Sequence, residues 1–167
     1  LATREIPEQV MQTILPGQCT VSDTKRILHY FRRSPDGKRI IFGGRPPLMR
    51  GGIQAKARTL YRDMVSIFPQ LRPYPPACVW AGNVGFTRDH LPHTGQYNGM
   101  IYAAGYCGHG VALATYHGQK LAAWILGQEQ AQELFAASDF PPFPLYRKRA
   151  WFVPPALAWY ALLDRFS

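Results

Sequence analysis

The chain has 167 residues, of which 47% are hydrophobic and 13% aromatic, so it is long enough and apolar enough for a folded domain with its own core. No run of about 18 apolar residues occurs, and the first residues do not form a signal peptide, which argues against a membrane span and a secretory leader. Nineteen basic against ten acidic residues give a net charge of +9, but the basic residues are scattered, so nucleic acid is not the expected partner.

Two features bear on compartment and completeness. The chain does not begin with methionine, so we expect a fragment, a processed product or a trimmed form of a longer protein. The cysteines are odd in number and widely spaced, which predicts a reducing, cytoplasmic compartment and no disulfide framework. They are Cys19, Cys78 and Cys107.

Four residues could in principle hold zinc, namely the pairs His90 with His93 and Cys107 with His109. Their spacing matches no common finger or ribbon pattern, and the second pair lies inside a glycine-rich turn. No metal site is therefore expected.

A short helix around Val10 and Ile14 is followed by a predicted hairpin. Its strands span residues 25–33 and 38–43, joined by the turn Ser34-Pro35-Asp36-Gly37. Alternation along the first strand places His29, Phe31 and Arg33 on one face and Leu28, Tyr30 and Arg32 on the other. Tyr30 and Arg32 either line a polar pocket or belong to an ordinary solvent-exposed face.

Apolar residues at helical spacing predict a helix over residues 57–68, ended by Pro69. Residues 78–81 are interpreted as a buried strand, and residues 82–95 as a long loop. Loops of this length that carry several polar side chains are often functional. The polar residues are Asn83, Arg88, Asp89, His90 and His93.

A strand over residues 100–104, a glycine-rich turn over 105–110 and a helix reaching to Gly127 follow. Glycines let the backbone approach a ligand closely, and the first helical turn offers unpaired N–H groups at the positive end of the helix dipole. The pattern therefore predicts an anion site, with a tight connection that binds nothing as the alternative.

One face of this helix is predicted to be buried, with small residues that would allow close approach of a backbone or a flat ligand. Its members are Val111, Ala114, Gly118, Leu121, Ala122 and Ile125. Beyond it we expect a short helical piece over residues 129–137, the proline-rich segment 140–144, and a last helix opened by Pro154 and Pro155. That last helix is apolar nearly all round, so it would pack on missing parts of the protein, on a partner chain or on a membrane surface, in that order of preference.

Three motifs occur in a characteristic order: Trp80-Ala81-Gly82, the stretch from Thr87 to Gly95, and the stretch from Tyr102 to Leu113. Together they resemble the C-terminal third of the FAD-dependent amino acid and amine oxidase superfamily, which includes D-amino acid oxidase, glycine oxidase and sarcosine oxidase. The hairpin and the tail over residues 143–147 are most similar to the gamma-glutamylputrescine oxidase branch. The resemblance covers about residues 15–165.

The resemblance implies an α+β fold: a mixed or antiparallel substrate-domain sheet with packed helices, plus the last strand and helix of an FAD-binding Rossmann-like domain. Residues 1–78 would form most of the substrate-covering sheet domain. Residues 79–128 would supply the C-terminal strand, loop and helix of the flavin domain, and residues 129–167 a helical, proline-rich tail.

The resemblance also implies a cofactor, a reaction and a site. The backbone of five residues would face the pyrimidine edge of the flavin: Gly108, His109, Gly110, Val111 and Ala112. The family reaction is hydride transfer from the carbon beside an amine to the flavin, followed by peroxide formation and imine hydrolysis. His109 is a weak candidate for a general base, because a histidine in such a turn is more often positional. The candidates for lining the substrate site are Tyr30, Arg32, Asn83, Val84, Arg88, Asp89 and His90.

Several departures from the family pattern refine these expectations. The dinucleotide fingerprint G-x-G-x-x-G after a first strand is absent, so the main ADP-binding part is missing and the chain alone should bind FAD weakly or not at all and be inactive. Asn83 and Val84 stand where amino-acid-oxidising relatives often carry arginine, which favours an amine over an α-carboxylate substrate. The cysteine around Gly82 that relatives with covalent flavin use is not present, so the flavin should be non-covalent, and Ala112 replaces a threonine of some relatives.

The expected partners are the missing N-terminal FAD-binding portion and a small amine, with a homo-oligomer left open. The rival interpretation is a basic binding or regulatory module that retains the fold remnant without chemistry.

Overall fold

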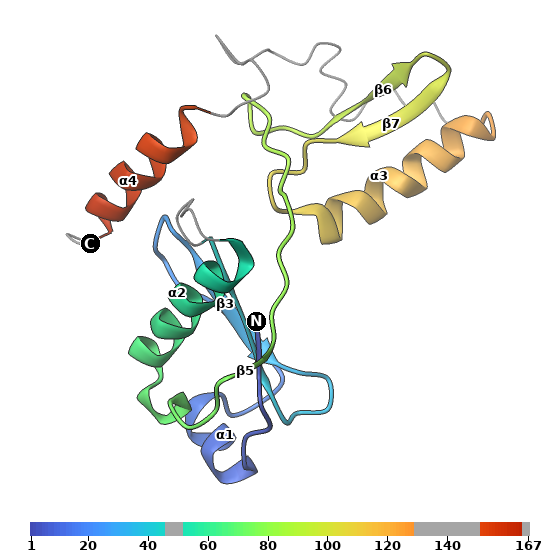
Figure 1. Cartoon of the computed structure of the whole chain (residues 1–167). Helices are drawn as coiled ribbons and strands as arrows, with labels where there is room; N and C mark the ends of the chain where they lie inside the picture. Colours follow the sequence, from blue (N-terminus) through green and yellow to red (C-terminus); the bar gives the residue numbers. More distant parts are fainter. Residues whose placement is uncertain (46–51, 129–150, 165–167) are drawn as a thin grey trace. The chain divides into compact units, whose positions relative to one another are not determined.

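The computed structural model describes residues 1–45, 52–128 and 151–164 (Figure 1). The chain divides into two compact units. Unit 1 comprises residues 1–81 and 150–167, and unit 2 comprises residues 82–149. In the described residues no helix has the length and apolar character needed to cross a membrane.

Unit 1 is built on an antiparallel five-stranded sheet with the strand order β2-β3-β4-β1-β5. Its strands are β1 (Ala2–Thr3), β2 (Thr20–Ser22), β3 (His29–Arg33), β4 (Ile40–Gly44) and β5 (Pro76–Cys78). The helices of this unit are α1 (Glu8–Ile14), α2 (Gly52–Ile67) and α4 (Val153–Leu163), with a 3-10 turn over Pro69–Leu71. The predicted α+β class is confirmed.

The predicted hairpin is confirmed, with β3 paired to β4 in the register Phe31 to Phe42. Gly37 takes a positive φ of 74° in the connecting turn, and its N–H donates to the Ser34 carbonyl at 2.8 Å. The first strand begins at His29 and not at Lys25, because the Asp23 carboxylate accepts the N–H groups of Lys25 and His29 and bends the chain into a local turn before the strand.

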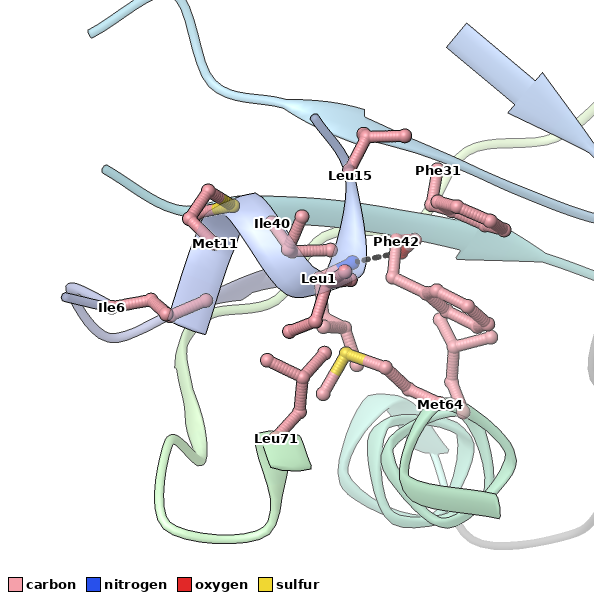
Figure 2. Close-up of a cluster of buried hydrophobic side chains, with 11 residues drawn as sticks. Leu1, Ile6, Met11, Leu15, Phe31, Ile40, Phe42, Met64 and Leu71 are labelled. Carbon is pink, nitrogen blue, oxygen red and sulfur yellow. Dashed lines mark hydrogen bonds between the residues drawn. The ribbon is translucent and has the colours of Figure 1, made fainter. Parts of the chain in front are cut away.

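The core of unit 1 lies between the sheet and its helices (Figure 2). Phe31 stacks parallel to Phe42 at a centroid distance of 6.0 Å, and Met64 of α2 is fully buried beside them. The other core members come from α1, α2, β4, the 3-10 turn and the flanking segments. They are Leu1, Ile6, Met11, Ile14, Leu15, Ile40, Leu60 and Leu71.

One expectation for the sheet region is corrected. Residues 78–81 do not form a buried strand: β5 ends at Cys78, which is exposed, and Trp80 is 57% exposed. The pairing of β5 with β1 ends at Cys78, and the described residues offer no further strand or packed side chain that would cover Trp80.

Unit 2 contains the hairpin of β6 (His93–Tyr97) and β7 (Met100–Ala104), followed by α3 (Gly110–Ile125). The loop predicted to reach Gly95 ends at Pro92, since β6 starts at His93. Asn98 and Gly99 both have positive φ, at 48° and 80°, which is the two-residue turn that suits a tight antiparallel hairpin.

The prediction that one face of α3 is buried is wrong for the described residues. Val111 is 94% exposed and Ile125 is 65% exposed, and Ala114, Gly118 and Ala122 are exposed as well. Only Leu121 of the predicted face is partly covered. The apolar residues do lie on one face of α3, but apart from Leu121 the described residues leave this face uncovered. A Cβ added to Gly118 would meet no atom within 4 Å.

The last helix forms as expected, with Pro154 and Pro155 in the first turn of α4. Its C-terminal residue Asp164 accepts the backbone N–H groups of Arg26 and Ile27 at 3.0 and 2.9 Å. The expected elements over residues 129–137 and 140–144 lie outside the described residues.

Candidate functional site: the glycine turn and the start of α3

The backbone between β7 and α3 adopts conformations that few residue types can take. Gly105, Cys107 and Gly108 have φ values of 81°, 52° and 100°. Glycine occupies such left-handed conformations at little cost, whereas for Cys107 the neighbouring structure must compensate. The turn reverses the chain sharply and delivers it into α3 at Gly110.

The first turn of α3 presents backbone donors. His109 is the N-cap and makes no side-chain cap hydrogen bond, while its own N–H donates to the Tyr106 carbonyl at 2.9 Å. Across the residues that the structure describes, no acceptor is recorded for the N–H groups of Gly110, Val111 and Ala112. These groups lie at the positive end of the helix dipole, and the side chains of His109, Val111 and Ala112 are exposed. The arrangement therefore suits a negatively charged or electron-rich ligand edge.

The loop before β6 is tied to the back of this turn. The Cys107 N–H donates to the Gly85 carbonyl at 3.1 Å, and the Thr87 N–H lies 3.5 Å from the Cys107 thiol sulfur. The Thr87 hydroxyl donates to the Leu91 carbonyl at 2.9 Å. Thr87 and Cys107 are both buried. The loop and the turn therefore form one packed structure within unit 2.

Asp89 organises the second half of the loop. Its carboxylate accepts the Leu91 N–H at 3.1 Å and contacts the ring of the fully buried His93 at 3.2 Å. The Leu91 N–H is the main reason why the pKa of Asp89 lies below its usual value, and the His93 contact adds to this lowering. Asp89 therefore carries its charge to lower pH than an ordinary aspartate.

The other loop candidates are placed at the surface of unit 2. Asn83, Val84, Arg88 and His90 are exposed, and His90 has a φ of 60° with its ring edge-on to Phe86 at 6.3 Å. These residues share one loop with Asp89, so the structure brings the predicted loop set together.

Tyr30 and Arg32 belong to unit 1. They lie on the exposed face of β3, on the opposite side from the buried residues, as the alternation predicted. The Tyr30 ring covers Gly43 of β4, where an added Cβ would meet the ring at 2.1 Å. The Arg32 guanidinium donates to the Arg33 carbonyl at 3.1 Å.

The sequence patterns indicate no role for Thr87 and only a possible zinc ligand in Cys107. Their contact joins positions 20 residues apart that no local pattern links. The available signal was a non-glycine residue inside a glycine-rich turn, since a side chain at such a position needs contacts to hold it.

The two residue pairs considered for zinc do not assemble into a metal site. Among the described residues no group of three or more histidine, cysteine, aspartate or glutamate side chains could hold a metal ion. His93 instead contacts Asp89, and Cys107 contacts Thr87.

An α+β fragment with exposed amides after a glycine turn is typical of cofactor-binding oxidoreductases. Residues 1–124 match the FAD dependent oxidoreductase (DAO) family, and the chain belongs to that family. The implied cofactor is therefore FAD.

Two similar proteins show which members of the family this chain resembles. The chain is 36% identical over 157 residues to "Probable oxidoreductase OrdL" of Rhizobium meliloti (strain 1021), covering 92% of this chain and 36% of the relative. It is 28% identical over 174 residues to "Gamma-glutamylputrescine oxidoreductase" of Escherichia coli (strain K12), covering 100% of this chain and 39% of the relative. The chain thus spans little more than a third of the length of these proteins. No solved structure gives a significant match.

Proposed function

We propose that this chain is the C-terminal part of an FAD-dependent oxidoreductase that oxidises an amine. The observation that carries the proposal is the set of amides at Gly110, Val111 and Ala112 for which the described residues offer no acceptor, in a chain that belongs to the FAD dependent oxidoreductase family. The likeness to a gamma-glutamylputrescine oxidoreductase supports an amine substrate, as does Val84 in place of an arginine two residues after Gly82.

The residues of the turn fit a flavin edge. The glycines leave no Cβ between the backbone and a flat ring, and the N–H groups point out of the start of α3. Gly108, His109, Gly110, Val111 and Ala112 would hold the pyrimidine edge through their backbone, without a hydroxyl from Ala112. A bound flavin supplies the acceptor for a hydride and its electrons. The chain's own amides stabilise the negative charge that this acceptor gains.

The loop residues Asn83, Val84, Arg88, Asp89 and His90 would line the substrate site. For Tyr30 and Arg32, on the exposed face of β3, a substrate-lining role stays a prediction. His109 is exposed beside the proposed ring position and is a weak candidate for moving a proton.

The main partner in this proposal is an N-terminal FAD-binding portion. In the part of unit 2 that the structure describes, few side chains are buried, and most of those are polar or a thiol: Thr87, Pro92, His93, Cys107 and His117. An exposed apolar face on α3 beside so small a core supports a covering segment. The free cysteines support a reducing, cytoplasmic location.

A titration with FAD tests the proposal. The 167-residue chain and a form extended by the coding sequence upstream of Leu1 are titrated while flavin fluorescence is followed. We expect binding and amine-dependent peroxide formation in the extended form, and weak or no binding without turnover in the shorter chain. An extended form that binds no FAD would contradict the proposal and favour a basic binding or regulatory module.

A further inference from the structure

Thr87 joins the loop before β6 to the glycine turn through both its hydroxyl and its methyl group. Its hydroxyl lies 2.9 Å from the Leu91 carbonyl and 3.4 Å from the Cys107 sulfur. Its methyl group fills the space beside Gly105, where an added Cβ would lie 2.4 Å from Thr87 Cγ2. The side chain is 8% exposed, so these contacts are shielded from water.

Cys107 is the part of the turn that receives these contacts. Its φ of 52° is a left-handed conformation, held by the N–H bond to the Gly85 carbonyl at 3.1 Å. The thiol donates to the Gly105 carbonyl at 3.2 Å or to the Thr87 hydroxyl, and it accepts from the Thr87 N–H. Thr87 therefore contacts both Gly105 and Cys107, the two positive-φ residues that begin the turn.

The direction of the first turn of α3 follows from the dihedral angles at residues 105–109, since the helix begins at Gly110. The effect of a helix N-terminus on a nearby charge falls off within one turn and depends on where the N–H groups point. A contact that fixes Gly105 and Cys107 thereby also fixes the aim of the amides at Gly110, Val111 and Ala112.

We propose that Thr87 is a positioning residue that sets the reduction potential of the bound flavin through Cys107 and Gly105, which fix the direction of the α3 amides. This inference rests on the proposed function and adds a residue outside the set that faces the cofactor. Thr87 acts on the amides and not on the ring.

Two substitutions separate the hydroxyl from the methyl group. Thr87→Val keeps the branched shape and removes the hydroxyl, and Thr87→Ser keeps the hydroxyl and removes the methyl group. Thr94→Val is the matched control, because it removes the same hydroxyl from a residue of β6 that pairs with Ala103 and not with the turn. Two quantities are measured: the reduction potential of flavin bound to the extended protein, and amide hydrogen exchange at Cys107 and His109 in the 167-residue chain.

In Thr87→Val we expect exchange at Cys107 to accelerate about tenfold and the preference for reduced flavin to fall about tenfold, which is a drop of about 30 mV for a two-electron couple. Thr87→Ser should restore most of the potential, and Thr94→Val should leave both quantities unchanged. If Thr87→Val does not fold, Cys107→Ala takes its place, with the same fall in potential expected.

Three outcomes overturn the inference. A Thr87→Val protein that holds flavin at an unchanged potential contradicts it and leaves the proposed function intact. An equal drop in Thr94→Val also contradicts it, because the effect would then be general. If the unmodified extended protein binds no flavin, both this inference and the proposed function are contradicted.

Discussion

At Gly105 both the backbone conformation and the packing require a residue without a Cβ. Its φ of 81° lies in the region that a Cβ disfavours, and the space a Cβ would need is taken by Thr87 Cγ2. Thr87 is a short, buried side chain, so it has no flexible end that could move aside. The glycine is therefore required twice over.

Gly105→Ala should destabilise unit 2 by at least about 1–2 kcal/mol from the backbone conformation alone, and by more once the contact with Thr87 is included. The measurement is urea unfolding followed by the NMR amide signals of β6 and β7. Gly85→Ala is the matched control, because no atom lies within 4 Å of its added Cβ and its φ is not positive, so the expected change is within about 0.5 kcal/mol. Equal effects of the two substitutions would contradict this explanation.

At the scale of the elements, α4 is held at its C-terminal end by Asp164. The carboxylate accepts the backbone N–H groups of Arg26 and Ile27 and lies 3.6 Å from the Arg26 guanidinium. These contacts, the Ile27 N–H first among them, hold the pKa of Asp164 below its usual value. No residue of α4 is buried. The hydrogen bonds of Asp164 to Arg26 and Ile27 therefore attach the helix at a defined point.

The attachment of α4 should depend on pH. A carboxylate whose pKa is depressed in the folded state adds stability that is complete above the unfolded value, about 3.9, and is lost as the pH falls through the lower folded value. We therefore expect the amide shifts of Arg26 and Ile27 to stay constant above about pH 5 and to change in more acidic solution.

An NMR titration of these two amides provides the measurement. In Asp164→Asn the same amides should not titrate, because the acceptor can no longer gain a proton. The Ile40 N–H donates to the Thr3 hydroxyl, which does not titrate, and serves as the internal control. A titration of Arg26 and Ile27 that persists in Asp164→Asn would show that another group is responsible.

At the scale of the whole molecule, the two units differ in how they are stabilised. Unit 1 has an apolar core that joins sheet and helices, with Ile40, Phe42, Met11, Met64 and Leu71 fully buried. Unit 2 also carries apolar side chains, but some of those on α3 are exposed, Val111 and Ile125 among them. Apolar side chains therefore form a core in one unit and an open face in the other.

Gly118→Ala tests whether the open face of α3 is covered in a longer protein. In the 167-residue chain the substitution should stabilise α3 by about 1 kcal/mol, because nothing lies near the added Cβ and alanine favours a helix. In the form extended upstream of Leu1, the added methyl group should instead destabilise the protein, since a packed neighbour leaves no room for it.

Thermal unfolding of both forms, with and without the substitution, gives the comparison. Gln119→Ala, at the neighbouring exposed position, should have little effect in either form. Equal stabilisation of both forms by Gly118→Ala would contradict a covered face.

The sequence by itself determined the local elements of this protein and its family. The turn at Ser34–Gly37, the helix that ends before Pro69, the strand of residues 100–104 and the glycine turn all follow from nearby residues, because φ preferences and apolar periodicity act over a few positions. The candidate loop was recognised for the same reason, as a run of polar residues between apolar segments.

Only the tertiary structure decided which faces are buried and which residues support the site. The periodicity of α3 marked an apolar face but could not say whether this chain covers it, because burial depends on what packs there from elsewhere. Trp80 is exposed for the same reason. The contact between Thr87 and Cys107 joins distant positions, and it exists because the loop folds back on the turn, where Gly105 leaves room for a methyl group.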